Sequence, residues 1–249
     1  MSGHSKWNSI KHRKAAQDAR RGKLFTKLIR EITVAARQGG ADADANPRLR
    51  LAVVQARSHN IPGETIQRAI TKGASGTDGV QYEEVIYEGY GPHRVAVVVE
   101  ALTDNRKRTA ASLRHAFNRH HGGLGATNSV QYMFERKGTL TVAHHAIDED
   151  TLTEYILKAG AEDLEDLGEA YLVITPVTRF DAVRKFLEEK GVRIEAAELQ
   201  RLPQNRVSIE SKEEAERVLT FLEALEEDDD VQKVFSNFEI DEAIIADLA

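Results

Sequence analysis

Residues 139–202 carry the pattern that most constrains the fold of this chain. Strand-like and helix-like segments follow one another there in the order β-α-β-β-α-β, which is the order of the ferredoxin-like split unit. Such a unit packs its two helices on one face of a four-stranded sheet and is a complete small domain. The strands are expected at 139–142, 163–167, 171–175 and 194–202, and the helices at 150–158 and 180–190.

The residues before residue 74 indicate helices only. On the first long helix, apolar residues recur with a helical period on one face, and a basic stripe lies opposite them. Gly39-Gly40 is expected to end this helix, and Asn46-Pro47 has the N-cap and first-turn residues of the next. A last helix is expected from Pro62 to Gly73, followed by a glycine-rich linker. The inward residues are expected to be Leu24, Phe25, Leu28, Ile29, Ile32, Leu49, Val53, Ala56, Ile66 and Ile70.

The segments on either side of the ferredoxin-like unit are expected to form one further domain. The tail after residue 203 is too short to fold alone, so it is expected to complete the middle part of the chain. The expected elements are strands at 82–87, 95–101, 130–134, 206–209 and 231–240, and helices at 105–120 and 211–227. The predicted fold is therefore a multi-domain α and α+β protein. Its domains are an all-helical basic domain at 1–78, a discontinuous α+β domain at 79–136 plus 204–249, and an inserted acidic ferredoxin-like domain at 137–203.

Charge is distributed very unevenly along the chain, although the formal net charge is only −6. Residues 1–73 hold 15 Lys/Arg against 5 Asp/Glu, a net of +10. Residues 74–137 hold 8 against 7, a net of +1, and residues 138–249 hold 11 against 28, a net of −17. A basic N-terminal domain on an acidic protein indicates an anionic partner, with nucleic acid favoured over a membrane surface.

The basic residues of the first helical domain, with those of the helix at 105–120, are the candidate phosphate ligands. Lys and Arg neutralise phosphates, and the Trp and His among them can stack on unpaired bases. The alternative is that these cations contact the acidic half of the same chain. The candidates are Lys6, Trp7, Lys11, His12, Arg13, Lys14, Arg20, Arg21, Lys23, Lys27, Arg30, Arg37, Arg106, Arg108 and Arg114.

Several other functions are disfavoured. The chain has no cysteine, which excludes disulfides, thiolate nucleophiles and cysteine-ligated metals. The histidine pairs lack metal-ligand spacing, so no metal or other cofactor is expected. The glycine-rich run at 122–129 follows a helix and precedes a strand, which favours a turn over a nucleotide loop. The acidic run 226–230 is expected to be a solvated helix end. No motif of a catalytic site is present, so no enzymatic activity and no small-molecule substrate are expected.

Six runs of residues closely resemble the YebC (PmpR) family, and the likeness extends over the whole chain. The runs are Gly3-His4-Ser5-Lys6-Trp7, Ile10 to Asp18, Phe25 to Ile32, Asn46-Pro47-Arg48-Leu49-Arg50, Tyr87 to Pro92, and Leu102 to Arg106.

The resemblance implies a three-domain architecture and a cytoplasmic regulator of gene expression. Members are generally described as DNA-binding transcriptional regulators. Mitochondrial relatives activate the translation of cytochrome oxidase, and bacterial relatives are linked to the ribosome and to synthesis through proline-rich stretches. DNA and ribosomal RNA therefore both stand as expected partners, and a membrane does not.

Two positions depart from the family pattern. The resemblance implies small residues after Gly91-Pro92, where this chain has His93-Arg94. It also implies a glycine at Asn128, whose turn is expected to survive because Asn tolerates the left-handed backbone conformation.

Overall fold

The computed structural model describes residues 17–76, 79–241 and 244–245, with side chains from residue 22 onward. These residues form two compact units. The larger unit contains residues 17–129 and 213–234, and the smaller unit contains residues 130–212 and those from 235 onward.

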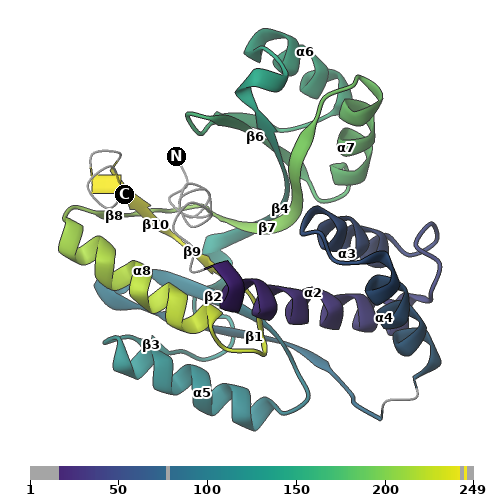
Figure 1. The fold of residues 1–249 in the computed structure, drawn as a ribbon. Helices are drawn as coiled ribbons and strands as arrows, with labels where there is room; N and C mark the ends of the chain where they lie inside the picture. Colours follow the sequence, from purple (N-terminus) through teal and green to yellow (C-terminus); the bar gives the residue numbers. More distant parts are fainter. Residues whose placement is uncertain (1–16, 77–78, 242–243, 246–249) are drawn as a thin grey trace. The chain divides into compact units, whose positions relative to one another are not determined.

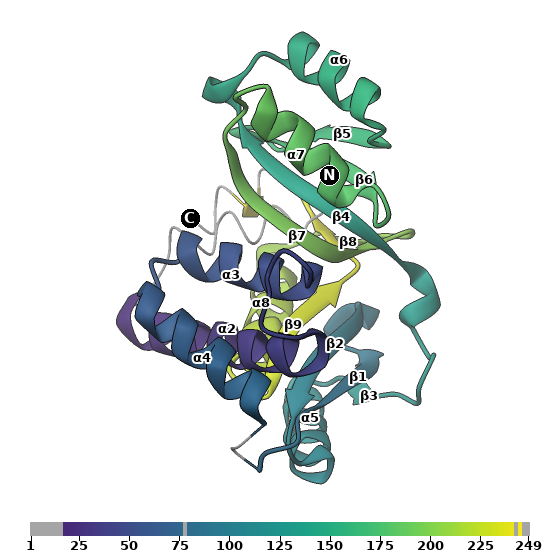
Figure 2. The same cartoon turned by 90° about the vertical axis from the view of Figure 1, so that its right-hand side faces the viewer.

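Three helices at the start of the larger unit enclose a small apolar core. They are α2 (Gln17–Gly39), α3 (Pro47–Ser58) and α4 (Gly63–Ser75) (Figures 1 and 2). The predicted apolar faces are confirmed, because Leu28, Ile32 and Leu49 are buried together with Val53, Ala56, Ile66 and Ile70. Leu24, Phe25 and Ile29 pack against the margin of this core.

The helix ends follow local signals in the sequence. Gly40 adopts a left-handed backbone (φ 89°) directly after α2, as the glycine pair predicts. The side chain of Asn46 accepts a hydrogen bond from the Leu49 N–H, and Pro47 is the first residue of α3. Because the first N–H groups of a helix have no partner within it, this cap confirms the predicted start of α3.

The predicted end of α4 at Gly73 is wrong. The helix continues through Gly73 to Ser75, and Gly76 (φ 62°) ends it in the left-handed conformation. Gly73 is buried inside the helix, where a Cβ atom would come within 2.2 Å of the Thr33 carbonyl oxygen on α2. The absence of a side chain at Gly73 therefore allows α4 to pack closely on α2, and Gly73 does not end α4.

The remainder of the larger unit is a four-stranded sheet with helices packed against it. Helix α5 runs from Arg106 to Arg119 and α8 from Lys212 to Glu226, and their Phe117 and Phe221 rings meet edge to face with centroids 4.9 Å apart. The strand order is β3-β1-β2-β9, so a strand from near the C-terminus completes the sheet. The strands are β1 (Glu83–Tyr90), β2 (Ala96–Thr103), β3 (Gly123–Leu124) and β9 (Val231–Ser236).

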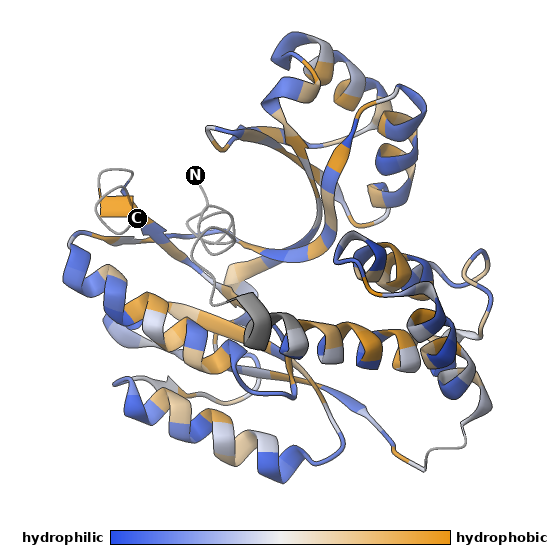
Figure 3. Cartoon of the chain, in the orientation of Figure 1, coloured by the Kyte–Doolittle hydropathy of each residue, from blue (hydrophilic) through white to orange (hydrophobic). Residues whose placement is uncertain are grey.

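Hydrophilic and hydrophobic residues alternate along α8, which is typical of a helix with one face on a sheet (Figure 3). Its buried residues include Val218, Phe221, Leu222 and Leu225.

The smaller unit has the element order that the sequence predicts. Its four-stranded sheet has the order β5-β6-β4-β7 with every pair antiparallel (Figure 2). Phe180 of α7 packs on Gly138 of β4. The elements are β4 (Phe134–Ala143), η3 (His144–Ala146), α6 (Glu149–Ala159), β5 (Asp163–Asp166), β6 (Ala170–Pro176), α7 (Phe180–Glu189) and β7 (Ile194–Pro203).

Two predicted strands need correction. Residues 131–133 form a 3-10 turn, η2 (Gln131–Met133), because the Met133 N–H bonds the Val130 carbonyl, and the strand expected at 130–134 is therefore wrong. Strand β4 begins at Phe134, which lies opposite Pro203 of β7. The strand expected at 231–240 is two strands: β9 lies in the larger unit's sheet, and β10 (Phe238–Ile240) pairs in parallel with β8 (Val207–Ile209).

None of the helices over the described ranges is long and apolar enough to cross a lipid bilayer.

Candidate nucleic-acid interface

Two lysines of α2 cap the C-terminal end of α8. The last carbonyl groups of a helix lack partners within it and form the negative end of the helix dipole. The Lys23 Nζ donates a hydrogen bond to the Glu227 carbonyl oxygen (2.9 Å), and the Lys27 Nζ donates to the Glu226 carbonyl oxygen (2.6 Å). Part of the predicted basic stripe is therefore bound to the chain's own acidic run.

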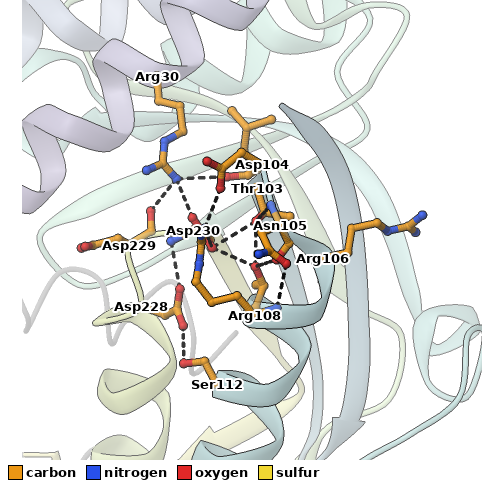
Figure 4. Close-up of polar contacts among 12 residues, drawn as sticks. Arg30, Thr103, Asp104, Asn105, Arg106, Arg108, Ser112, Asp228, Asp229 and Asp230 are labelled. Carbon is orange, nitrogen blue, oxygen red and sulfur yellow. Dashed lines mark hydrogen bonds and ion pairs between the residues drawn. The ribbon is translucent and has the colours of Figure 1, made fainter. Parts of the chain in front are cut away.

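Asp230 is the centre of a buried polar cluster that joins α2 to α5 (Figure 4). The Arg30 Nη1 contacts the Asp230 carboxylate at 3.2 Å and the Asp229 carbonyl at 2.8 Å. From α5, the Arg108 Nη2 reaches the other carboxylate oxygen at 2.6 Å. The prediction of a solvated end at residues 226–230 is thus wrong at Asp230, whose carboxylate has two arginine partners and little contact with solvent.

Two threonine hydroxyl groups complete the shell around Asp230. Thr103 and Thr109 donate to the same carboxylate oxygen at 3.1 and 2.8 Å, and both threonines are fully buried. Burial raises the pKa of Asp230, but the hydrogen bonds from Arg108, Thr109 and Thr103 outweigh burial and hold that pKa below its ordinary value. The carboxylate is therefore kept ionised between its cations.

Arg37, the last residue of the predicted stripe, also contacts the main chain. Its guanidinium donates to the carbonyl oxygen of Val80, which lies three residues before β1. In the structure, Lys23, Lys27, Arg30 and Arg37 thus all have partners within the chain. Their contact with phosphate stays a prediction, and it would require these bonds to exchange.

Helix α5 presents the other predicted cations, and no carboxylate lies within its sequence. Arg106 points away from the Asp230 cluster (Figure 4), and it forms an ion pair with Glu83 at 3.5 Å that joins two largely exposed side chains. Among the described residues, no partner is found for Lys107, Arg114 and Arg119, all of which are exposed. These three side chains can exchange bound counterions for phosphates without breaking an internal contact.

The periodicity of α5 gathers its cations on one side. Thr109, Leu113 and Phe117 are buried against the unit. Lys107 and Arg114 are seven residues apart, so they lie almost in line on the opposite side. A second row on that side holds Arg108, His115 and Arg119. We call the exposed side carrying these five residues the α5 basic face.

The glycine-rich run after α5 contains the predicted turn, but it also includes the short strand β3, which pairs with β1. The Gly125 N–H donates to the Glu88 carbonyl oxygen, and the Asn128 N–H donates to the buried Glu88 carboxylate, each at 2.7 Å. Asn128 has a φ of 64°, which confirms that it adopts the left-handed conformation expected of it.

Most of the N-terminal candidates lie beyond what the structure describes. Lys6, Trp7, Lys11, His12, Arg13 and Lys14 are outside the described residues, and the side chains of Arg20 and Arg21 are not described. Within the described part of the chain, no group of three or more His, Asp or Glu side chains is arranged to hold a metal ion.

No feature of the sequence distinguishes Asp230. It stands in a run of five acidic residues, and its arginine partners are 122 and 200 residues away, so no local signal separates it from its neighbours.

Comparison with known proteins links the whole chain to one family. Residues 5–76 match the TACO1/YebC protein N-terminal domain, and residues 82–238 match the TACO1/YebC second and third domain. Proteins named probable transcriptional regulatory protein from Desulforapulum autotrophicum and Persephonella marina are each 50% identical to it, with 98% of both chains covered. A solved structure of a conserved hypothetical protein from Aquifex aeolicus is 50% identical, with a TM-score of 0.84 over 92% of this chain and 95% of that one.

Proposed function

This chain belongs to the TACO1/YebC family, and from that premise we propose that it is a non-enzymatic, cytoplasmic regulator of gene expression that acts by binding nucleic acid. The observation that carries this proposal is the α5 basic face. It carries four Lys/Arg and one His on a helix that has no acidic residue, and Lys107, Arg114 and Arg119 are exposed without a partner among the described residues. A nucleic-acid backbone is the common cellular polyanion that matches such a face.

The N-terminal cations extend this surface in our proposal. Residues 1–21 hold six Lys/Arg against one acidic residue. They would add phosphate contacts to those of α5, with Trp7 and His12 available to stack on unpaired bases. The residues from 138 onward, with their net charge of −17, would oppose indiscriminate binding by repelling phosphates.

DNA and ribosomal RNA remain the two candidate ligands. The names of the relatives favour transcriptional regulation and hence DNA. The side chains of the α5 basic face favour contact with the backbone over reading of bases, because base-specific readers of duplex DNA also use Asn and Gln aimed at base edges. This second point supports a protein that recognises shape, such as a translation factor on ribosomal RNA that relieves stalling.

Crosslinking in cells, followed by sequencing of both bound DNA and bound RNA, tests the proposal. The wild type is expected to be enriched on one kind of nucleic acid, and the Lys107→Ala, Arg114→Ala, Arg119→Ala triple variant is expected to lose most of that enrichment. Enrichment at promoters would establish the transcriptional role, whereas enrichment on ribosomal RNA would establish the translational one.

A control variant removes the same charge elsewhere in the larger unit. Arg57 on α3, Arg68 on α4 and Arg217 on α8 are exposed, and replacing them with Ala leaves α5 unchanged. If both triple variants lose the same share of crosslinked nucleic acid, binding depends on net charge alone and not on the α5 basic face. The absence of any crosslinked nucleic acid with the wild type would overturn the proposal.

A further inference from the structure

The turn between β1 and β2 has an unusual backbone for its residues. The Val95 N–H bonds the Pro92 carbonyl oxygen at 3.2 Å, which closes a four-residue turn. Its two central residues both have positive φ, 56° at His93 and 59° at Arg94. Positive φ at both central positions defines the type I′ turn, which suits the twist of a hairpin and strongly favours Asn and Gly.

This backbone is strained because its central residues carry large side chains. For an L-residue the left-handed conformation costs about 1–2 kcal/mol. His is among the residues that tolerate it, but Arg is not. Glycine would remove the strain at Arg94, whose side chain is exposed and has no partner among the residues described. Packing therefore does not explain why arginine occupies this position.

The strained turn lies at the same end of the larger unit as the last residues of α5. Tyr90, at the end of β1, pairs with Gly123 of β3. A Cβ atom on Gly122 would come within 3.0 Å of the Gly91 Cα, so the chain leaving α5 packs directly on the chain entering the turn. The Phe221 ring lies beneath both segments, since it contacts Gly91 and stands 5.8 Å from the His120 ring.

The α5 basic face ends beside this turn. Arg119 is exposed in the last turn of α5, and His121 is exposed directly after it. On the other side of the turn's pair of central residues, the Glu214 carboxylate lies 3.5 Å from the His93 imidazole. His93 thus has an acidic neighbour within the chain, which leaves Arg94 as the outward-facing cation of the turn.

We propose that Arg94 is an additional phosphate-binding residue, held beyond the end of α5 by the strained β1–β2 turn. The inference rests on the proposed function, because the phosphate belongs to the same nucleic acid that the α5 basic face binds. Strained non-glycine residues cluster at active sites and at positions that hold ligands. In this chain the strained turn lowers the stability of the fold and provides one more contact with a phosphate of the nucleic acid.

The test is an Arg94→Gly variant of the full chain, because it is predicted to change stability and binding in opposite directions. Relief of strain is expected to raise the midpoint of thermal unfolding by about 2–4 °C. Loss of one phosphate contact is expected to weaken binding several-fold. It should also make the slope of log affinity against log salt shallower by about 1, measured with a labelled ribosomal RNA fragment and with duplex DNA.

Three further proteins make the result decisive. Arg94→Asn removes the charge but keeps a residue suited to the turn, so it should behave like Arg94→Gly. Arg94→Lys keeps the charge and should retain the salt slope, and Arg57→Ala, a matched exposed cation on α3, should change neither property. If Arg94→Gly is more stable but binds with an unchanged slope, the inference is wrong. If the α5 triple variant also leaves the slope unchanged, the proposed function fails with it.

Discussion

Asp230 shows how one carboxylate can join distant segments of a chain. It receives Arg30 from α2, Arg108 from α5, and the Thr103 and Thr109 hydroxyl groups, all within 3.2 Å. A buried charge that loses its opposite charge is strongly destabilising, because the remaining ions are left uncompensated. The contribution of this cluster to stability therefore depends on Asp230 remaining ionised.

Replacing Asp230 with Asn is expected to lower the free energy of unfolding by about 3 kcal/mol, measured by urea denaturation at neutral pH. Asp229→Asn is the matched control, because that exposed side chain lies next to the cluster while only its main-chain carbonyl takes part. Equal effects of the two substitutions would contradict the role given to the buried carboxylate.

The effect of pH on the stability difference between the wild type and Asp230→Asn follows from the pKa of Asp230. The pKa of Asp230 is lowered in the folded protein. Its stabilising contribution is therefore complete above the pKa of an unfolded aspartate, about 3.9, and is lost as the pH falls through the lower folded value. The difference in stability between the wild type and Asp230→Asn should shrink in that acidic window.

At the scale of elements, helix α2 contacts both the helical core and the end of α8. One side packs on α3 and α4, and the opposite side binds the end of α8 through Lys23 and Lys27. Its contact with α4 is close because Gly73 has no side chain, and the Thr33 carbonyl oxygen occupies the space that a Cβ atom would need.

Gly73→Ala is therefore expected to destabilise the protein by about 1–3 kcal/mol, as overpacking does in a well-packed core. Gly63→Ala, in the first turn of the same helix, meets no atom within 4 Å and is expected to be neutral or slightly stabilising. Thermal unfolding of the two variants provides the comparison. A Gly73→Ala protein as stable as the wild type would show that the two helices can separate without cost.

The elements differ in how far the sequence could predict them. The core face of α2, the Asn46 cap and the order of the smaller unit follow from local patterns, and the structure confirms them. The role of Gly73 could not be predicted, because a glycine after an apolar repeat has the same local pattern whether it ends a helix or allows a second helix to pack closely. Contact of the α2 cations with the acidic half of the chain is the alternative that the sequence leaves open, and the structure confirms it for Lys23, Lys27 and Arg30. Their individual partners could not be predicted, because these are about 200 residues away in the sequence.

At the scale of the whole molecule, the uneven charge now has two explanations. Part of the acidic C-terminal half serves the chain itself, since the run at 226–230 binds three cations of α2. On α5, by contrast, Lys107, Arg114 and Arg119 are exposed without a partner among the described residues, and so is Arg94 in the β1–β2 turn. The division into three domains and the phosphate contacts of the N-terminal cations stay predictions.

The central claim, that the α5 basic face binds a nucleic-acid backbone, is tested most directly by the salt dependence of binding. The affinities of the wild type and of the Lys107→Ala, Arg114→Ala, Arg119→Ala variant would be measured over a series of salt concentrations, with ribosomal RNA and with duplex DNA. Because each neutralised phosphate contributes about 0.7–0.9 to the slope of log affinity against log salt, the variant should have a slope shallower by about 2–3. The control with Arg57, Arg68 and Arg217 replaced should match the wild type, and an unchanged slope in the α5 variant would contradict the claim.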